Sequence, residues 1–413
     1  MDLSRLSRAV STDAAFRRRQ TLQPVGGKGD KIFPPTYPPE PGAPRNSPPR
    51  HVYERRRVNG GDVWCVLIDS VQSQANRLEE CLMGAIHDGV PIPHAVVDFA
   101  DSGLEGITRV TSLDAPHRVY DAILRDSLLE GESFMRSAVG RRLAKARPDD
   151  ASALLEVSPT SLLFGAWHST GEGGGLGAKF ARCLVSEIVG VGVPVEEVVL
   201  DRRTGETEIR TTGRRPGSRI DPLGVLKKVH VFKGEGDWST TEAGAGKKAR
   251  KVKPSEINHG NIPPSVQPLG VTCEYIEHSF VLSFAALRRL RFGGGERDAA
   301  ARALLAALGL MALHEQDSRG YALRSRCDLV CDGKAALELV HPDGQTETVT
   351  LAGADARTLY QQAFEAARQA GFHITAEPLR LIPQEKLVEI VRRSQELALA
   401  GAGGEGDEAA DDK

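Results

Sequence analysis

The sequence has little of what marks membrane-embedded, secreted or disulfide-rich proteins. Its 413 residues include six cysteines and no CxxC pair, and only 5% are aromatic. Scattered cysteines without paired spacing favour reduced thiols over a disulfide framework. The longest apolar run, residues 303–313, is shorter than the roughly 20 residues that span a bilayer, and the N-terminus has no apolar signal core. We therefore expect a cytoplasmic protein that does not enter a membrane.

The composition is that of a folded globular chain with unevenly distributed charge. Hydrophobic residues make up 40% and charged residues 26%, which argues against a wholly disordered or fibrous protein. The net charge of −2 excludes a uniformly basic coat for nucleic acid. Residues 202–253 nevertheless hold 14 Lys or Arg against six Asp or Glu, whereas residues 401–413 hold five acidic residues and one Lys. We expect the second segment to be a solvated, disordered acidic tail.

The N-terminal region is rich in proline and arginine. Nine of the 24 prolines lie between Pro24 and Pro49, where they cannot donate to a sheet or continue a helix. Triplets of arginine flank this segment at residues 17–19 and 55–57. The pattern predicts an extended arm over residues 1–60, either an exposed linker or a strand that lies along a polyanion.

Folding proper is expected to begin at Val63. Residues 63–68 form a continuous apolar run of strand length, and the helical spacing of the apolar residues in 75–86 predicts a helix after it. The junction between them is unusually polar. Capping by Ser70 or Ser73 explains only part of that polarity.

The middle of the chain mixes strand, loop and helix patterns. Residues 162–167 predict a strand that leads through a glycine-rich loop into a helix over 178–188. Two strand-like runs, 195–200 and 206–212, are joined by a basic loop and predict a hairpin. Residues 233–256 have no apolar period, so no structure is assigned to them.

The last third predicts a strand, a core helix, a three-strand meander and two amphipathic helices. The corresponding residues are 273–285, 299–313, 321–351, 354–370 and 384–399. Hairpins therefore occur together with strand–helix units. This mixture favours an α+β fold over a fully parallel doubly wound sheet.

The glycine-rich loop at residues 169–177 is the strongest local signal. Glycines let backbone amides approach an anion, and a helix N-terminus adds favourable partial charge. The loop does not fit a phosphate-binding P-loop, because Ala178 separates Gly177 from Lys179 and no Ser or Thr follows the lysine. Gly173, Gly175 and Ala178 nearly fit a dinucleotide fingerprint, which leaves a dinucleotide-dependent enzyme as one alternative.

Metal and catalytic sites have weaker support. The sequence offers His259, His278 and His314 but no HExxH motif and no paired CxxC spacing, so we expect no metal or other cofactor. His168 stands beside Ser169, but no orienting carboxylate can be named from the sequence. We expect His168 to be an ordinary hydrogen-bonded histidine.

Dispersed cationic and amide side chains favour nucleic acid as a ligand. Lys and Arg neutralise phosphates, whereas Asn, Gln, Ser and backbone amides bond to phosphate, sugar or exposed bases. Such a distribution suits a single strand that runs across a surface. The candidate RNA-binding residues are Arg17, Arg18, Arg19, Gln72, Gln74, Asn76, Arg77, His168, Ser169, Thr170, Gly173, Gly174, Gly175, Lys179, Arg182, Arg210, Arg214, Arg215, Asn258, His259 and Asn261.

Four long motifs occur in order along the chain, and together they resemble one family. The motifs are RRRQTLQPVGGKGDKIFPPTYP, VLIDSVQSQANRLEE, LLFGAWHSTGEGGGLGAKFARCLVSEIVG and NHGNIPPS. They resemble the RAMP-superfamily backbone subunit of type I-G, formerly I-U, CRISPR effector complexes. The resemblance runs from about residue 16 through the predicted meander.

The resemblance implies a fold and a function. The fold would be an RRM-like, or ferredoxin-like, palm over residues 61–400 with an inserted basic hairpin and loop region at about 200–262. Several copies would multimerise along a CRISPR guide RNA, with other effector subunits, and would present guide bases to target DNA without catalysing a reaction. The basic hairpin around residues 202–219 would be the thumb that wedges between guide nucleotides. The alternative within the superfamily is an endoribonuclease that matures guide RNA through His168 or His259.

Overall fold

The chain divides into two compact units. The computed structural model describes residues 1–39, 42, 49–168, 179–201, 206–211, 215–234, 237–267 and 269–401. The first unit consists of Met1–Ile209 and Val271–Gln384, and the second of Arg210–Gly270 and Glu385–Lys413. The predicted acidic tail lies almost entirely outside the described residues.

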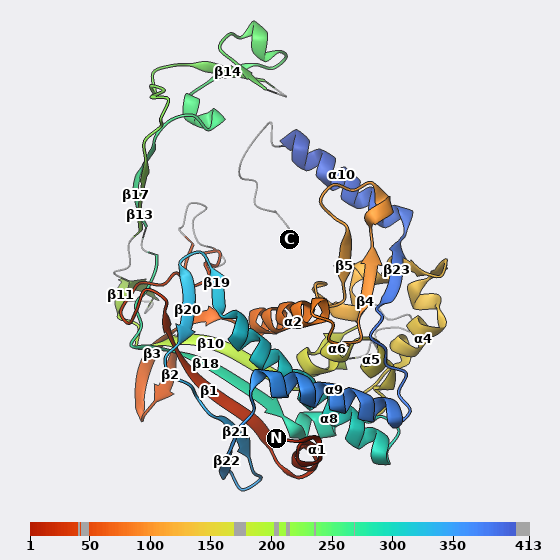
Figure 1. The fold of residues 1–413 in the computed structure, drawn as a ribbon. Coiled ribbons are helices and arrows are strands. Elements are labelled where there is room, and N and C mark those ends of the chain that lie inside the picture. Colours follow the sequence, from red (N-terminus) through yellow and green to blue (C-terminus); the bar gives the residue numbers. More distant parts are fainter. Residues whose placement is uncertain are drawn as a thin grey trace. The chain divides into compact units, whose positions relative to one another are not determined.

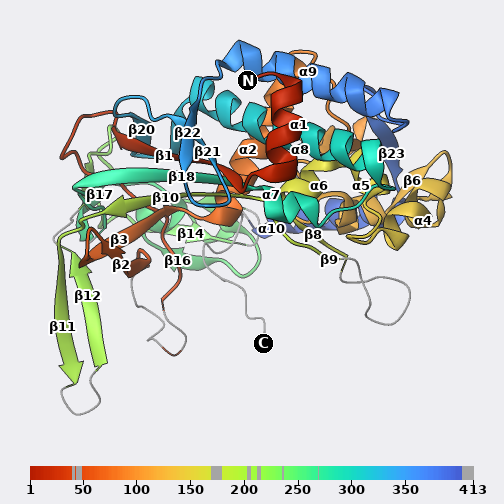
Figure 2. The ribbon, with the colours of Figure 1, turned by 90° about the horizontal axis from the view of Figure 1, so that it is seen from below.

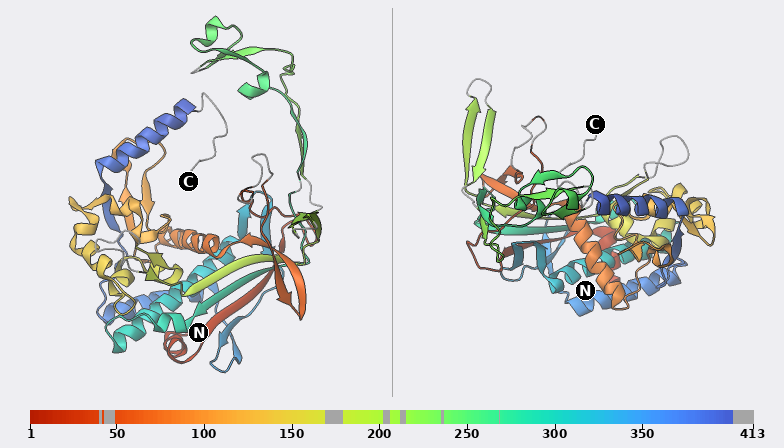
Figure 3. Two further views of the ribbon diagram at one scale, coloured as in Figure 1. Left: turned by 180° about the vertical axis from the view of Figure 1, so that it is seen from behind. Right: turned by 90° about the horizontal axis from the view of Figure 1, so that it is seen from above.

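A nine-stranded antiparallel sheet, counted over the described residues, organises the first unit (Figure 1). The strands, in spatial order, are β19 (Tyr321–Arg324), β20 (Cys327–Cys331), β1 (Ala15–Pro24), β18 (Tyr275–Ser283), β10 (Leu184–Val191), β3 (Gly61–Asp69) and β2 (Tyr53–Val58), with β21 (Leu337–Val340) and β22 (Thr346–Val349) joined to β1 through β21. The left view of Figure 3 shows β1, β18 and β10 running side by side.

Helices cover one face of this sheet. The helices of the first unit are α1 (Leu3–Thr12), α2 (Val71–His87), α3 (Ala122–Arg125), α4 (Ala138–Lys145), α5 (Ser152–Val157), α6 (Pro159–Phe164), α7 (Phe284–Arg288), α8 (Gly295–Arg319) and α9 (Gly353–Gln369). Helix α8 is the centre of the core: its residues 303–308 are almost fully buried. A Cβ on Gly309 would come within 3.1 Å of Leu184, so a small residue there lets α8 approach β10 closely. Figure 2 shows α9 running beside α8 on its other side.

Smaller sheets complete the first unit. One five-stranded sheet has the order β5 (Arg109–Thr111), β4 (Ala95–Asp98), β23 (Leu379–Pro383), β6 (Ser127–Leu129) and β7 (Glu132–Ser133). Two further strand pairs are β8 (Ala166–Trp167) with β9 (Lys179–Phe180), and β11 (Val195–Asp201) with β12 (Glu206–Thr211). The predicted pairing of residues 195–200 with 206–212 is thus confirmed.

The second unit is built from short strands and a terminal helix. Its strands form the pair β13 (Arg215–Arg219) and β17 (Ile262–Gln267), and a sheet of β15 (Trp238–Ser239), β14 (Val231–Lys233) and β16 (Arg250–Val252). Helix α10 (Glu385–Gly401) belongs to the same unit. Residues 233–256, to which the sequence assigned no structure, therefore contribute strands. These strands are only two or three residues long, so an alternation of apolar and polar residues cannot reveal them.

The α+β prediction is confirmed, and three local predictions are wrong. Folding does not begin at Val63: β1 is an internal strand of the main sheet, and its Phe16 and Leu22 are buried. The strand predicted over 162–167 is wrong for residues 162–164, because they belong to helix α6, which begins at Pro159; proline is favoured in the first turn of a helix. The helix expected over 178–188 does not form in its described part, residues 179–188, which contains β9 and the first five residues of β10. The RRM-like arrangement stays a prediction.

Candidate nucleic-acid interface

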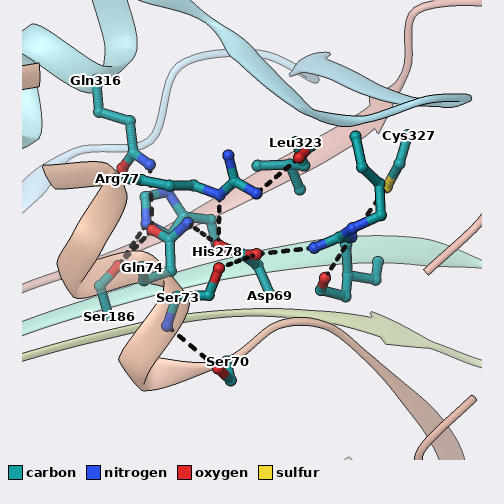
Figure 4. A network of polar contacts seen from close by, with 12 residues as sticks. Asp69, Ser70, Ser73, Gln74, Arg77, Ser186, His278, Gln316, Leu323 and Cys327 are labelled. Atoms are coloured by element: carbon teal, nitrogen blue, oxygen red, sulfur yellow. Dashed lines mark hydrogen bonds and ion pairs between the residues drawn. The ribbon is translucent and has the colours of Figure 1, made fainter. Parts of the chain in front are cut away.

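The polar junction after β3 forms a buried network around Asp69 (Figure 4). The carboxylate of Asp69 has no exposed surface, and four side chains donate to it. These donors are Ser73 Oγ at 2.8 Å, Gln74 Nε2 at 2.7 Å, Arg77 Nε at 2.9 Å and Arg324 Nη2 at 3.0 Å. Ser70 caps α2 through the backbone NH of Ser73, as the sequence predicted. Ser73, Gln74 and Arg77 of the junction thus serve to satisfy one buried charge.

The network continues under the sheet to His278. The hydroxyl of Ser186 donates to Gln74 Oε1 at 3.0 Å, and Ser186 Oγ lies 2.7 Å from His278 Nε2. The other imidazole nitrogen lies 3.2 Å from the hydroxyl of Tyr321, which donates to Asp317 at 2.6 Å. Arg18 completes the chain with a two-pronged ion pair to Asp317. One continuous set of contacts therefore connects β3, α2, β10, β18, α8 and β1.

The Ser186–His278 contact has the form of a nucleophile and its base, but its surroundings are structural. Ser186 is 2% exposed and His278 has no exposed surface, so a substrate cannot reach them in this conformation. Burial, together with a smaller contribution from the nearby Arg18 guanidinium, lowers the pKa of His278 to about 3. An imidazole that stays neutral at neutral pH and is enclosed on all sides suits a packing role.

This network holds three of the residues predicted to bind RNA. Arg18, Gln74 and Arg77 are buried or half-buried and already donate to protein acceptors. Their side chains are thus not part of an exposed cationic surface, because the sheet and α2 enclose them. The other two candidates on α2, Gln72 and Asn76, are exposed.

Arg17 and Arg19 lie on the other face of β1, since alternate strand residues point to opposite faces. Arg17 Nε contacts Glu338 Oε2 at 2.8 Å, and Arg19 Nη2 contacts Glu277 Oε2 at 2.7 Å. Both cations are therefore on the open face of the sheet, but each already has a carboxylate partner. A phosphate would have to compete with that partner.

The β8–β9 pair presents a different surface. Trp167 stands directly opposite Lys179 in the strand register, and the ammonium of Lys179 lies 5.9 Å from the centre of the indole ring. Trp167 is 61% exposed. Lys179 and Arg182 are also exposed, and among the residues that the structure describes neither forms an ion pair with a carboxylate. Sequence reasoning missed Trp167, although an apolar residue next to a glycine-rich loop is a usable signal.

A buried ion pair supports this surface from below. Arg118 donates to both carboxylate oxygens of Glu79, at 2.8 and 2.7 Å, and to the carbonyl oxygen of Gly165 at 3.0 Å. Arg118 has a φ of 55°, which is uncommon for a residue other than glycine. Gly165 has a φ of 86°, and a Cβ there would meet Phe180 O at 3.1 Å. The turn before β8 is thus held in a conformation that favours glycine.

His168 lies beneath the same strands. Its ring stacks on Tyr120 with centroids 4.8 Å apart and an interplanar angle of 9°. Its Nδ1 has no hydrogen-bond partner among the described residues. Burial lowers the pKa of His168, and Arg125 and Arg147 lower it further. Within the described part of the chain, His168 thus lacks the expected hydrogen bond at Nδ1 and has no carboxylate that orients its ring.

The candidate residues of the second unit are only partly described. Asn258 is exposed with a φ of 61°, and the carboxamide oxygen of Asn261 accepts from the backbone NH of Asp221 at 2.6 Å. His259 packs edge-on against Trp238 at 5.6 Å. Arg210 and Arg215 lie on β12 and β13, with side chains outside the description.

The glycine loop itself lies outside the described residues. Its members Ser169, Thr170, Gly173, Gly174 and Gly175, together with Arg214 elsewhere, are therefore not placed. The elements around the loop are informative: β9 and β10 follow it where a helix was expected. A dinucleotide fingerprint needs a helix N-terminus directly after such a loop, so the fingerprint prediction is wrong.

Two further searches cover the described part of the chain. Nowhere in it do three or more His, Cys, Asp or Glu side chains gather as metal ligands. Among its helices, none combines the length and apolar character needed to cross a membrane.

One family of known proteins matches part of the chain. No curated protein matches it. Residues 16–195 match the family model described as CRISPR-associated protein GSU0053. This match spans β1, the Asp69 network's β3 and α2, and the β8–β9 surface. The resemblance predicted from the motifs is thereby confirmed at this level: residues 16–195 are similar to the CRISPR-associated GSU0053 family.

Proposed function

We propose that this protein is a noncatalytic subunit that multimerises along CRISPR guide RNA in an antiviral effector complex. The observation that carries the proposal is the pair of exposed cations Lys179 and Arg182, without carboxylate partners among the described residues and within the region that matches the family. Cations left unpaired on a surface attract an external anion, and a guide RNA supplies a continuous row of phosphates.

The absence of a catalytic role is part of the proposal. The Ser–His contact at Ser186 is enclosed, and His168 packs on Tyr120 without an orienting carboxylate among the described residues. General acid–base catalysis needs a titratable group within reach of a substrate. Scaffolding needs only positioning contacts, which the exposed cations and amides supply.

Further parts of the proposal concern assembly. The paired strands β11 and β12, joined by a loop that contains Arg202 and Arg203, would act as the thumb between guide nucleotides. Other copies of the chain and other effector subunits would be its protein partners, and target DNA would be contacted through the guide. Basic residues concentrated between 202 and 219 support this assignment.

Copurification with a guide transcript tests the proposal. The protein, expressed with its CRISPR RNA, should elute as RNA-bound multimers, and native mass spectrometry should resolve a ladder of copy numbers. Affinity for single-stranded RNA should fall with salt by about 0.7 log units per log unit of salt for each phosphate contact. A protein that stays monomeric and empty at low ionic strength would refute the proposal.

Incubation with repeat-containing RNA tests the noncatalytic part. The RNA should remain intact with and without divalent metal. Cleavage that disappears in His168→Ala or His259→Ala would instead identify a guide-maturing endoribonuclease.

A further inference from the structure

The β8–β9 surface exposes a large aromatic ring. The chain has three tryptophans. Trp64 lies under the guanidinium of Arg55 at 4.8 Å, and Trp238 is 41% exposed and packs against His259. Trp167 is the most exposed of the three at 61%. Leaving this much indole in water forgoes hydrophobic stabilisation, so a ligand that covers the ring would recover it.

The strand register gives this ring a fixed cationic neighbour. Trp167 and Lys179 are direct partners in an antiparallel pair, and directly opposed residues have their side chains on the same face. Their cation–π contact orients the indole before any ligand binds. Arg182 follows three residues after Lys179 and is exposed.

The electrostatic surroundings favour an anion. The pKa of Arg182 is lowered by its partial burial and then by the nearby Arg118 guanidinium, and no carboxylate among the described residues raises it. The buried carboxylate of Glu79 is already held by Arg118 with two hydrogen bonds. The positive charge at this surface is therefore not neutralised from below.

An aromatic face beside two cations matches the chemistry of a single-stranded nucleotide. Bases stack on aromatic rings, whereas neighbouring phosphates pair with Lys or Arg. A duplex keeps its base faces inside the stack, so it cannot present them to the indole. An acidic peptide would use the cations but leave the ring uncovered.

We propose that Trp167 stacks on one unpaired base of the bound RNA, while Lys179 and Arg182 hold the adjacent phosphates. This inference rests on the proposed RNA-binding function and adds to it a base-contacting residue. Stacking accepts any base, so the contact would fix the position of the guide without selecting its sequence.

Tryptophan fluorescence tests the stacking directly. In a Trp64→Phe/Trp238→Phe variant, Trp167 is the remaining tryptophan. Titration with single-stranded guide RNA at low salt should quench its emission in step with binding, and a perfectly paired RNA duplex should quench it much less. Quenching that is equal for both RNAs, or absent although single-stranded RNA binds, would overturn the proposal.

Affinity measurements on the otherwise unchanged protein give a second test. Trp167→Ala should weaken binding of single-stranded RNA by about 5- to 150-fold, which corresponds to the range of about 1–3 kcal/mol for loss of one stacked base. Trp167→Phe should retain most of the affinity, and Trp238→Ala serves as a matched control with little effect. Equal affinity of Trp167→Ala and wild type would refute stacking.

The outcomes separate this inference from the function on which it rests. If the wild-type protein binds no RNA, the proposed function fails. If it binds RNA but Trp167→Ala binds equally well, only the stacking proposal fails. Circular dichroism checks that each variant is folded. If the Trp64→Phe/Trp238→Phe variant does not fold, the affinities of the Trp167 variants decide; if the Trp167 variants do not fold, the fluorescence titration decides.

Discussion

The Asp69 network and the β8–β9 surface place cations in opposite situations. Around Asp69, Arg77 and Arg324 both reach a carboxylate that is fully enclosed. On the β8–β9 surface, Lys179 and Arg182 are exposed and find no carboxylate among the described residues. Asp69 and Arg77, like Lys179 and Arg182, lie within the family-matched residues 16–195, yet the two regions use the same residue types differently.

The difference follows from the cost of burying charge. A charge removed from water must be paired and hydrogen-bonded, so every cation near Asp69 is used internally. An exposed cation is already solvated and keeps its capacity to bind an external anion. Exposure and pairing, rather than the presence of Arg or Lys, thus distinguish a structural cluster from a candidate RNA-binding surface.

The largest effect should come from breaking the buried cluster. Asp69→Ala leaves Arg77 and Arg324 with uncompensated charge, and we expect a loss of about 3–5 kcal/mol in the free energy of unfolding. Chemical denaturation monitored by circular dichroism measures it. Asp62→Ala is the matched control, because Asp62 is exposed and its nearest contact to Arg57 is 3.6 Å; it should cost less than about 1 kcal/mol. Similar losses in both variants would contradict the contrast.

A second effect should appear on acidification. The pKa of His278 is lowered to about 3, mainly by burial, whereas in the unfolded chain histidine titrates near about 6.5. Between these values the unfolded state binds the additional proton, so stability falls as pH falls. From about pH 7 to about pH 5 His278 should cost about 2 kcal/mol, and His278→Gln should lack this component.

His341 provides the control of opposite sign. Its hydrogen bond to Asp13 raises the pKa of this exposed imidazole. The folded state therefore binds the proton more tightly, and the contribution of His341 is present at low pH and lost as pH rises through its folded pKa. His341→Gln should not reduce the acid sensitivity of unfolding. If His278→Gln and His341→Gln behaved alike, the buried neutral state of His278 would be wrong.

Removing the cation Lys179 from the β8–β9 surface tests whether this side chain contacts a phosphate. Lys179→Ala should weaken single-stranded RNA binding about tenfold at low salt, for all sequences alike, and reduce the salt slope by about 0.7 for the lost phosphate contact. Fluorescence anisotropy over a salt series measures both quantities. Lys28→Ala is the matched control, because Lys28 is exposed but paired with Asp332 at 2.7 Å. Base-selective weakening would argue against a phosphate contact.

The smallest effect should come from the open sheet face. Arg19 is 64% exposed in its pair with Glu277, so Arg19→Ala should change the free energy of unfolding by about 1 kcal/mol or less. Arg18, its neighbour on the buried face, should cost clearly more when replaced, since Asp317 would lose its partner. Thermal unfolding of the two variants tests this ordering, and equal shifts would contradict it.

The sequence predicted elements well where one pattern was unambiguous. The long apolar helix became α8, and the 63–68 run became β3, followed by α2 with Ser70 as its cap. It failed where a short apolar run suits two structures. The helix predicted over residues 178–188 is wrong because residues 184–188 belong to β10, which pairs with β18 on one side and with β3 on the other and is therefore a strand.

The RNA contacts that the sequence predicts also divide into exposed residues and buried ones. The sequence predicted RNA contacts for Lys179 and Arg182, which are exposed. It predicted the same for Arg18 and Arg77, but these two arginines form ion pairs with Asp317 and Asp69 inside the protein. Nothing in the local sequence distinguishes Arg18 from Arg19. Only the position of β1 within the sheet, with helices on one face, separates their roles.

The sequence by itself determined the α+β class, the core helix, the hairpin of residues 195–212 and the similarity of residues 16–195 to a CRISPR-associated family, because these depend on local periodicity and on ordered motifs. The tertiary structure decided which charged residues form buried ion pairs and which stay exposed and able to bind an external anion. The reason is that the burial of a charge depends on neighbours that are distant in sequence. The Asp69 carboxylate draws Arg324 from 255 residues away, whereas Trp167 and Lys179 meet on a surface where no described carboxylate competes for the cation.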